Sequence, residues 1–212
     1  MIVLSHRGFW LNQAEKNSLV AFERSFSLGI GVETDIRDWD GRLVISHDLP
    51  NCDSIPFENF ISLYLQYPLR PILALNIKAD GLQNELEGIL NKFDVKNYFL
   101  FDMAVPDGLL YIKRGLNTFT RHSEYEPVPP YYAMAQGVWL DEFESHWLTD
   151  ETIKKHLSMG KAICIVSPEL HNRPFEKEWA HYRELEKEIG TDRLILCTDL
   201  PERAKEFFNA EN

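Results

Sequence analysis

The stretch GVETDIRDWDGRLVISHD, residues 31–48, combines a strand, a tight turn and a returning strand. Glu33 and Asp35 are two residues apart, so on a strand both carboxylates leave the same face and can share one cation. Asp40 and Gly41 lie between two apolar-alternating runs, which indicates a hairpin turn. The stretch therefore predicts an acidic strand face that is followed at once by a hairpin.

The length of the hairpin loop decides on which face His47 lies. With a three-residue loop, residues 39–41, the pairing sets Glu33 opposite His47, and directly opposed residues share a face. A two-residue loop sets His47 opposite Thr34 and turns it to the other side. We expect the three-residue loop, because it brings the histidine to the acidic pair.

Short apolar runs that suit strands alternate with amphipathic stretches along the whole chain, which is typical of strand-helix-strand units and a parallel sheet. Eight such runs predict an α/β fold, a compact (β/α)8 TIM barrel, since about 200 residues is a rough floor for that fold. The alternative, an open doubly wound sheet, lacks its glycine-rich nucleotide loop. The eight expected strands are 2–4, 31–37, 72–77, 98–103, 117–120, 137–140, 162–167 and 193–198.

The first helix has clear end signals, because Asn17 or Ser18 can cap its start and Gly29 can stop it. Prolines within residues 123–136 predict an irregular loop there, since proline removes a backbone donor and restricts its neighbour. Further helices are expected at 60–66, 83–92, 150–158, 177–189 and 201–209.

Composition is that of an ordinary globular protein, with 212 residues, 44% hydrophobic and 26% charged, so we expect one domain spanning residues 1–212. No apolar run is long enough for an integral membrane segment, and the start lacks signal-peptide features, so a cytoplasmic location is expected. Three cysteines without paired spacing argue against a disulfide framework or zinc knuckle, and we expect buried thiols. The oligomeric state stays open.

The formal net charge of -11 argues against nucleic acid or an acidic membrane surface as the main partner. A small anionic substrate remains compatible if a local positive site opposes the global field. Arg7 and Lys78 are the candidates for that site.

The acid/base and metal-ligand candidates fall at one end of the expected barrel. His6 and Arg7 follow the first strand, and Glu33 and Asp35 lie toward the carboxyl end of the second, where barrel active sites are found. Histidine titrates near neutral pH, so His6 and His47 suit proton transfer. Taken alone, the acidic pair also fits a solvated strand edge.

Several separated motifs, in order and at family-like spacing, resemble those of glycerophosphodiester phosphodiesterases. They lie at both ends of the chain, and no single one would suffice. The motifs are His6-Arg7-Gly8, Asn17-Ser18-Leu19-x-Ala21-Phe22, Gly31-Val32-Glu33-Thr34-Asp35, Asp40-Gly41-x-Leu43-Val44, His47-Asp48 and Thr198-Asp199-Leu200-Pro201.

The resemblance implies a barrel enzyme that cleaves a small glycerophosphodiester with a divalent ion, Ca2+ or Mg2+. It implies that the histidines are general acid and base, and that the substrate's own glycerol hydroxyl attacks phosphorus to give a cyclic phosphate that water opens. In this chain the roles pass to His6 and His47 for proton transfer, Arg7 and Lys78 for phosphate, and Glu33, Asp35 and Asn76 for metal.

Two departures from the family pattern affect metal and substrate. The family's third strand carries Glu-x-Lys, whereas this chain has Asn76-x-Lys78, so a neutral amide oxygen replaces one carboxylate and metal binding is expected to be weaker or more calcium-like. The insertion that usually follows the histidine is reduced to residues 49–59, which predicts a more open site and leaves the alcohol group undetermined.

Other functions and residues remain as alternatives. A non-catalytic barrel that binds a phosphate ligand fits the asparagine and the missing insertion, whereas an amidohydrolase-type metal enzyme lacks its His-x-His pair. Arg121 and His122 could reach the rim, and Trp139 and Asp141 could line the cavity or belong to the core. Surface positions are expected for the remaining histidines, His146, His156, His171 and His181.

Overall fold

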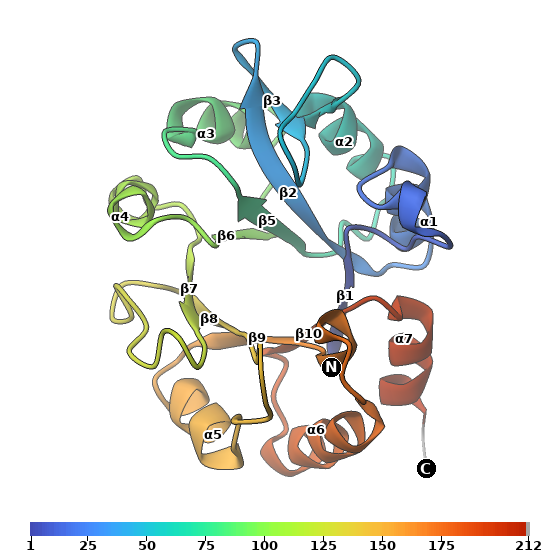
Figure 1. The fold of residues 1–212 in the computed structure, drawn as a ribbon, viewed down its shortest axis with the longest axis vertical. Helices are drawn as coiled ribbons and strands as arrows, with labels where there is room; N and C mark the ends of the chain where they lie inside the picture. The colour runs from blue at the N-terminus through green and yellow to red at the C-terminus, as the bar shows by residue number, and fades with distance from the viewer. Residues whose placement is uncertain (211–212) are drawn as a thin grey trace.

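The computed structural model describes residues 1–210, in which strands and helices alternate as the sequence predicts (Figure 1). Within these residues, each of the eight expected parallel strands is present. The strands are β1 Ile2–His6, β2 Gly31–Trp39, β3 Arg42–Ile45, β4 Ile55–Pro56, β5 Leu73–Ile77, β6 Tyr98–Phe101, β7 Phe119–His122, β8 Gly137–Leu140, β9 Ala162–Val166 and β10 Leu194–Thr198. The α-helices are α1 Leu19–Ser27, α2 Phe57–Tyr64, α3 Gln83–Lys92, α4 Val105–Lys113, α5 Asp150–Ser158, α6 Glu176–Ile189 and α7 Pro201–Asn209.

The parallel strands follow one another in the order β6-β5-β2-β1-β10-β9-β8-β7, and the helices lie around the outside of this curved sheet (Figure 1). Its two end strands, β6 and β7, meet at one parallel bridge between Leu100 and Thr118. The Leu100 amide also donates to the carbonyl of Asn117 at 2.8 Å. The fold is therefore α/β with a mostly parallel, TIM-barrel-like sheet.

Helix positions follow the sequence signals with two differences. The Ser18 hydroxyl caps α1 by accepting from the Ala21 amide at 3.2 Å, and residues 123–136 form turns without a helix, as expected. Helix α4 was not predicted, although Pro106 lies in its first turn, where a missing N–H costs nothing. Helix α2 begins at Phe57, three residues earlier than expected, because Pro56 takes the N-cap position.

The hairpin between β2 and β3 has a two-residue loop, so the predicted three-residue register is wrong. Trp39 pairs with Arg42 and Ile36 with Ile45. Asp40 and Gly41 both have positive φ, 49° and 72°, the conformation of the tight turn whose twist matches that of the flanking strands. The ladder alone would therefore direct His47 away from the acidic face.

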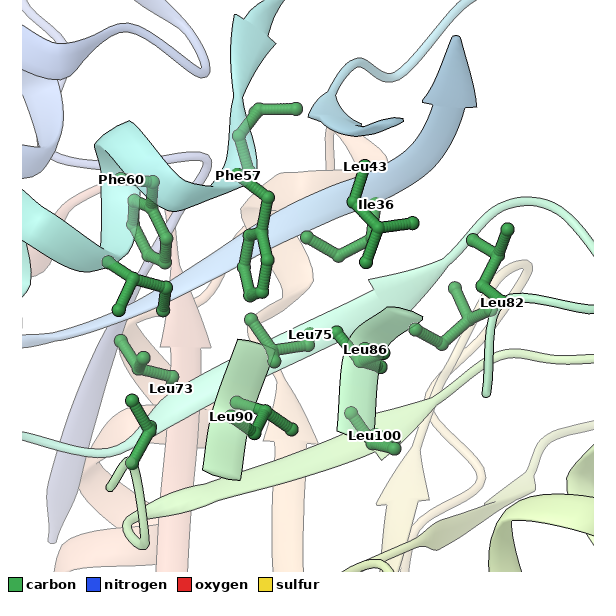
Figure 2. Close-up of a cluster of buried hydrophobic side chains, with 14 of the residues drawn as sticks. Ile36, Leu43, Phe57, Phe60, Leu73, Leu75, Leu82, Leu86, Leu90 and Leu100 are labelled. Carbon is green, nitrogen blue, oxygen red and sulfur yellow. The ribbon is translucent and has the colours of Figure 1, made fainter. Parts of the chain in front are cut away.

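One apolar core lies between the sheet and α1 to α3. Figure 2 shows Ile36 and Leu75 from the strands beside Phe57 of α2, and Leu100 beside Leu86 and Leu90 of α3. A second core packs α5, α6 and α7 against β8 to β10. Burying each such side chain contributes about 1.5 to 3 kcal/mol, so these layers fix the helices around the sheet.

The inner face of the sheet carries a separate apolar layer, to which seven of the eight parallel strands contribute. The rings of Phe99 on β6 and Phe119 on β7 stack with centroids 3.9 Å apart, directly beside the single bridge between these strands. Gly137 on β8 leaves the space for Phe119, because a Cβ there would lie 2.3 Å from its ring. Side-chain stacking thus supports the place where the backbone ladder is weakest.

Two further expectations concern the cysteines and membrane-spanning helices, and both are considered for residues 1–210. Cys164 and Cys197 are buried free thiols as expected, but Cys52 is exposed. None of the helices there combines the length and apolar character that crossing a membrane requires.

Candidate active site

A cavity of about 310 Å³ opens at the carboxyl ends of the parallel strands. It brings together six of the seven residues predicted from the sequence to act at the site. The six are His6, Arg7, Glu33, His47, Asn76 and Lys78. The seventh, Asp35, is buried beside them and lies 3.4 Å from Arg7 Nε and 3.6 Å from Lys78 Nζ.

Strand register explains why these side chains share one face. His6 is the register partner of Glu33 across β1 and β2, and Asp35 is the partner of Asn76 across β2 and β5. Partners in parallel strands project to the same side, and this side continues as the inner apolar layer below. The polar residues therefore form a layer on top of the inner core.

The His-Arg-Gly motif makes a sharp backbone turn at the end of β1. Arg7 has φ 57°, and its amide donates to both the carbonyl oxygen and, at 3.2 Å, the carboxylate of Glu33. Gly8 has φ 84°, and a Cβ on it would lie 2.8 Å from that of Ala21. The glycine thus allows the turn to pack on α1, and the strained arginine is fixed over the acidic pair.

Glu33 is an unusual carboxyl group because it is only 2% exposed. Burial, followed by the charge of Asp35, raises its pKa to about 7, and His6, Arg7 and Lys78 oppose the shift. Asp35 is better satisfied, since it accepts a hydrogen bond from Asn17 Nδ2 at 2.9 Å and forms ion pairs with Arg7 and Lys78. The pair concentrates negative charge that a bound cation would stabilise.

Asn76 provides a direct test of whether a metal ion fits this site. Its Oδ1 atom is buried without a hydrogen-bond partner in residues 1–210, beside Asp35 on the neighbouring strand. Carboxylate and amide oxygens are the ligands that Ca2+ and Mg2+ prefer. Among the described residues, no three His, Cys, Asp or Glu side chains are grouped to hold a metal. The donors present fit a hard divalent ion.

His6 is oriented by a carboxylate that sequence reasoning did not assign to the site. Its Nδ1 atom lies 2.7 Å from Asp199 Oδ1, and its Nε2 atom lies 4.0 Å from Glu33 Oε2. Asp199 follows β10 and is held by its amide, which donates to Glu169. Asp199 is part of the Thr198-Asp199-Leu200-Pro201 motif, which is the sequence signal that could have assigned it to the site. A histidine bonded in this way has one ring nitrogen fixed and the other directed at the acidic pair.

His47 lines the same cavity, although the register of the β2–β3 hairpin does not place it there. Strand β3 ends at Ile45, and Arg37 then donates from Nε and Nη2 to the His47 carbonyl at 3.3 and 3.1 Å. Arg37 Nη1 also donates to the carbonyl of Lys78 at 3.0 Å. Arg37 therefore ties the loop that carries His47 to the end of β5. The His47 side chain is 43% exposed, and its Nδ1 lies 3.0 Å from Asp48 Oδ1.

Arg121, one of the alternative site residues considered from the sequence, lines the cavity. It forms ion pairs with Asp102 and Glu126, and Asp102 also pairs with Lys78 at 3.2 Å. Asp102 has φ 73°, a backbone conformation that residues other than glycine rarely adopt. This carboxylate positions two of the cavity's cations.

The remaining candidates divide between the cavity and a buried cluster behind it. Trp139 and Asp141 line the cavity, and so does His171, which was expected on the surface. His156 is also wrongly placed by the sequence, because it is buried and bonded to Tyr132 at 2.8 Å and to His122 at 3.1 Å. His146 and His181 are largely exposed, as predicted.

Three solved structures share this fold over nearly the whole chain. A protein provisionally named a glycerophosphodiester phosphodiesterase, from Galdieria sulphuraria, has a TM-score of 0.78 at 17% identity, covering 99% of this chain and 98% of that one. The glycerophosphoryl diester phosphodiesterase of Parabacteroides distasonis gives 0.68 at 14% identity, with 97% and 85% coverage. The glycerophosphodiester phosphodiesterase of Agrobacterium tumefaciens gives 0.63 at 14% identity, with 98% of both chains covered.

Sequence comparison gives no corresponding match: no protein-family model matches the chain, and no curated protein is significantly similar to it. At these identities the structural neighbours establish the fold.

Proposed function

We propose that the chain is a metal-dependent phosphoric diester hydrolase that cleaves a small glycerophosphodiester-like substrate. The observation that carries the proposal is one cavity lined by His6, His47, Arg7 and Lys78. These four residues lie around the buried carboxylates of Glu33 and Asp35. The fold likeness to three glycerophosphodiester phosphodiesterases supports the same reaction class.

The two cations provide the phosphate site in this proposal. Arg7 and Lys78 each lie within 4 Å of Asp35 and also line the cavity, so they present positive charge to an incoming anion without leaving their carboxylate partner. A chain with a net charge of -11 needs such a local site to hold a phosphodiester. Binding here would place phosphorus beside both histidines.

The histidines supply proton transfer. One takes the proton of the attacking glycerol hydroxyl, and the other gives a proton to the leaving alkoxide as the P–O bond breaks. Their roles reverse when water opens the cyclic phosphate, which regenerates the starting protonation states. Asp199 serves this chemistry as a positioning residue, because its bond to Nδ1 leaves Nε2 of His6 for the substrate.

A divalent ion, Ca2+ or Mg2+, would be held by Glu33, Asp35 and Asn76. When bound, it supplies positive charge that stabilises the developing charge on the phosphoryl oxygens. Such an ion would give the buried Asn76 oxygen a partner. It would also offset the burial and the Asp35 charge that raise the pKa of Glu33.

The alternative is a non-catalytic barrel that binds a phosphate ligand. The observation in its favour is Asn76, since one carboxylate fewer lowers the charge that would hold a metal. Phosphate-ligand binding without turnover in the presence of Ca2+ or Mg2+ would establish this function instead.

The test is a hydrolysis assay with glycerophosphodiesters and lysophospholipids and either ion, on the wild-type chain and the His6→Ala and His47→Ala variants. We expect turnover that each substitution lowers by about 10² to 10⁴-fold, the usual contribution of a general acid or base. Full activity in both variants, or turnover of no substrate, would contradict the proposal. His181→Ala is the matched control, because that histidine is exposed on α6.

Three further properties belong to the same proposal. We infer that β6 and β7 complete a closed (β/α)8 barrel, that residues 1–212 form one domain, and that the protein acts in the cytoplasm. Residues 211 and 212 of that domain lie outside the described residues. Slow solvent exchange of the Leu100 amide tests the closure between β6 and β7, one cooperative unfolding transition tests the single domain, and fractionation of cells that express the protein tests its location.

A further inference from the structure

The cavity has a second wall that the proposed chemistry leaves unused. It is formed where β8 and β9 end, by Asp141 and by His171 of the short 3-10 helix Pro168–His171. Asp141 is buried, and its Oδ1 atom lies 2.7 Å from His171 Nε2. Its other oxygen accepts from Trp139 Nε1 at 3.4 Å. A buried carboxylate thus fixes the histidine at the cavity.

The second wall faces the phosphate site across the sheet. Lys78 follows β5 and His171 follows β9, and these strands are four steps apart in the order β5-β2-β1-β10-β9. Both residues nevertheless line one cavity of about 310 Å³. A diester whose phosphate lies at Arg7 and Lys78 therefore has room to extend one alcohol group toward His171.

The free ring nitrogen of His171 defines what it can recognise. With Nε2 bonded to Asp141, Nδ1 has no hydrogen-bond partner among the described residues. A neutral imidazole that donates from Nε2 carries a lone pair on Nδ1, so it accepts a hydrogen bond from an O–H group. Phe143 packs edge-on against the ring at 5.1 Å and restricts its rotation. In that tautomer Nδ1 is an acceptor whose direction is fixed.

We propose that His171, held by Asp141, is a specificity-determining residue that accepts a hydrogen bond from a hydroxyl of the substrate's alcohol group. The favoured substrate is then a diester of a polyol, and this inference rests on the proposed function. The choline group of glycerophosphocholine offers no donor to Nδ1, because its trimethylammonium head carries neither O–H nor N–H. Such a substrate gains nothing from His171.

The first experiment compares glycerophosphoinositol and glycerophosphocholine as substrates of the full chain. His171→Phe keeps a ring of similar shape and removes the acceptor, and His171→Gln restores an acceptor oxygen. We expect His171→Phe to raise KM about tenfold for the inositol diester with kcat within about twofold, as loss of one hydrogen bond implies. KM for the choline diester should not change, and His171→Gln should recover part of the loss.

His181→Phe is the matched control, because His181 Nε2 forms the same kind of pair with Asp150, at 2.6 Å, away from the cavity. It should leave both substrates unaffected. An equal change for both substrates in His171→Phe, or no change for either, would overturn the inference. Melting temperatures of all variants identify any loss that comes from unfolding.

A binding measurement separates this inference from the proposed function. Calorimetry with myo-inositol 1-phosphate should give about tenfold weaker binding to His171→Phe than to the wild type. If no diester is hydrolysed but this difference is found, the proposed function fails, and His171 is a hydroxyl-binding residue of a non-catalytic site. If diesters are hydrolysed but the two proteins bind the ligand equally, the inference fails alone. If neither hydrolysis nor binding occurs, both are wrong.

Discussion

Arg37 is the residue that brings His47 to the cavity, and its substitution tests this directly. The hairpin ladder directs His47 to the wrong face, and three donor bonds from Arg37, to the carbonyls of His47 and Lys78 at 3.0 to 3.3 Å, hold its loop instead. Arg37→Met keeps the aliphatic stem and removes every donor. We expect the loop to open and His47 to leave the substrate.

The size of the effect follows from the bonds lost. Hydrogen bonds to a charged group contribute about 1.5 to 3 kcal/mol, and those to His47 are exposed, so we take about 1.4 kcal/mol for the set. This lowers the ratio of closed to open loop about tenfold, and kcat/KM falls by up to about the same factor.

The assay is kcat/KM for a glycerophosphodiester together with limited proteolysis of the loop at residues 46–54. Arg37→Met should be slower and cleaved faster in this loop. Arg42→Met is the control, because Arg42 lies exposed at the far end of the same hairpin. Unchanged kcat/KM and unchanged cleavage in Arg37→Met would show that Arg37 does not hold His47 at the cavity.

Three further predictions concern stability and the metal. Gly137→Ala forces a Cβ against Phe119 and should cost about 1 to 3 kcal/mol, lowering Tm by several degrees in calorimetry; an unchanged Tm would contradict it. Burial, and then the charge of His122, lowers the pKa of His156 to about 4, so the folded state binds fewer protons than the unfolded chain, whose histidine titrates near 6.5. This stability is present above about pH 6.5 and is lost as the pH falls through 4; about 2 kcal/mol should disappear between pH 7 and 5 in urea unfolding, with a weaker slope in His156→Phe. Asn76→Glu should tighten Ca2+ binding about tenfold in calorimetry, since it adds a third carboxylate, and equal affinity would argue against Asn76 as a ligand.

Much of the site could be predicted from the sequence because its residues lie at strand ends, where the parallel register is regular. The pair at Glu33 and Asp35 needed only the two-residue period of a strand, and Asn76 and Lys78 needed the same rule one strand further on. The three-residue register predicts the correct face for His47 for the wrong reason, because the observed ladder ends with Ser46 opposite Asp35 and Arg37 holds the loop beyond it.

Residues missed by the sequence depend on contacts between distant segments. His171 has polar neighbours in the sequence, and only the folding of β8 beside β9 brings Asp141 to it. His156 likewise has a surface-like sequence context, but α5 turns it into the interior toward Tyr132. Local patterning cannot distinguish such a histidine from a solvated one, because the partner lies 24 or more residues away.

The function that we propose for this cavity is the hydrolysis of a phosphodiester with a bound cation. Phosphorus-31 NMR of a glycerophosphodiester, incubated with the wild-type chain and Ca2+, tests it most directly. We expect loss of the diester signal, passage through a cyclic phosphate and growth of a phosphomonoester, all stopped by a chelator and by His6→Ala. A diester signal that persists with Ca2+ and with Mg2+, while the folded protein is present, would contradict it.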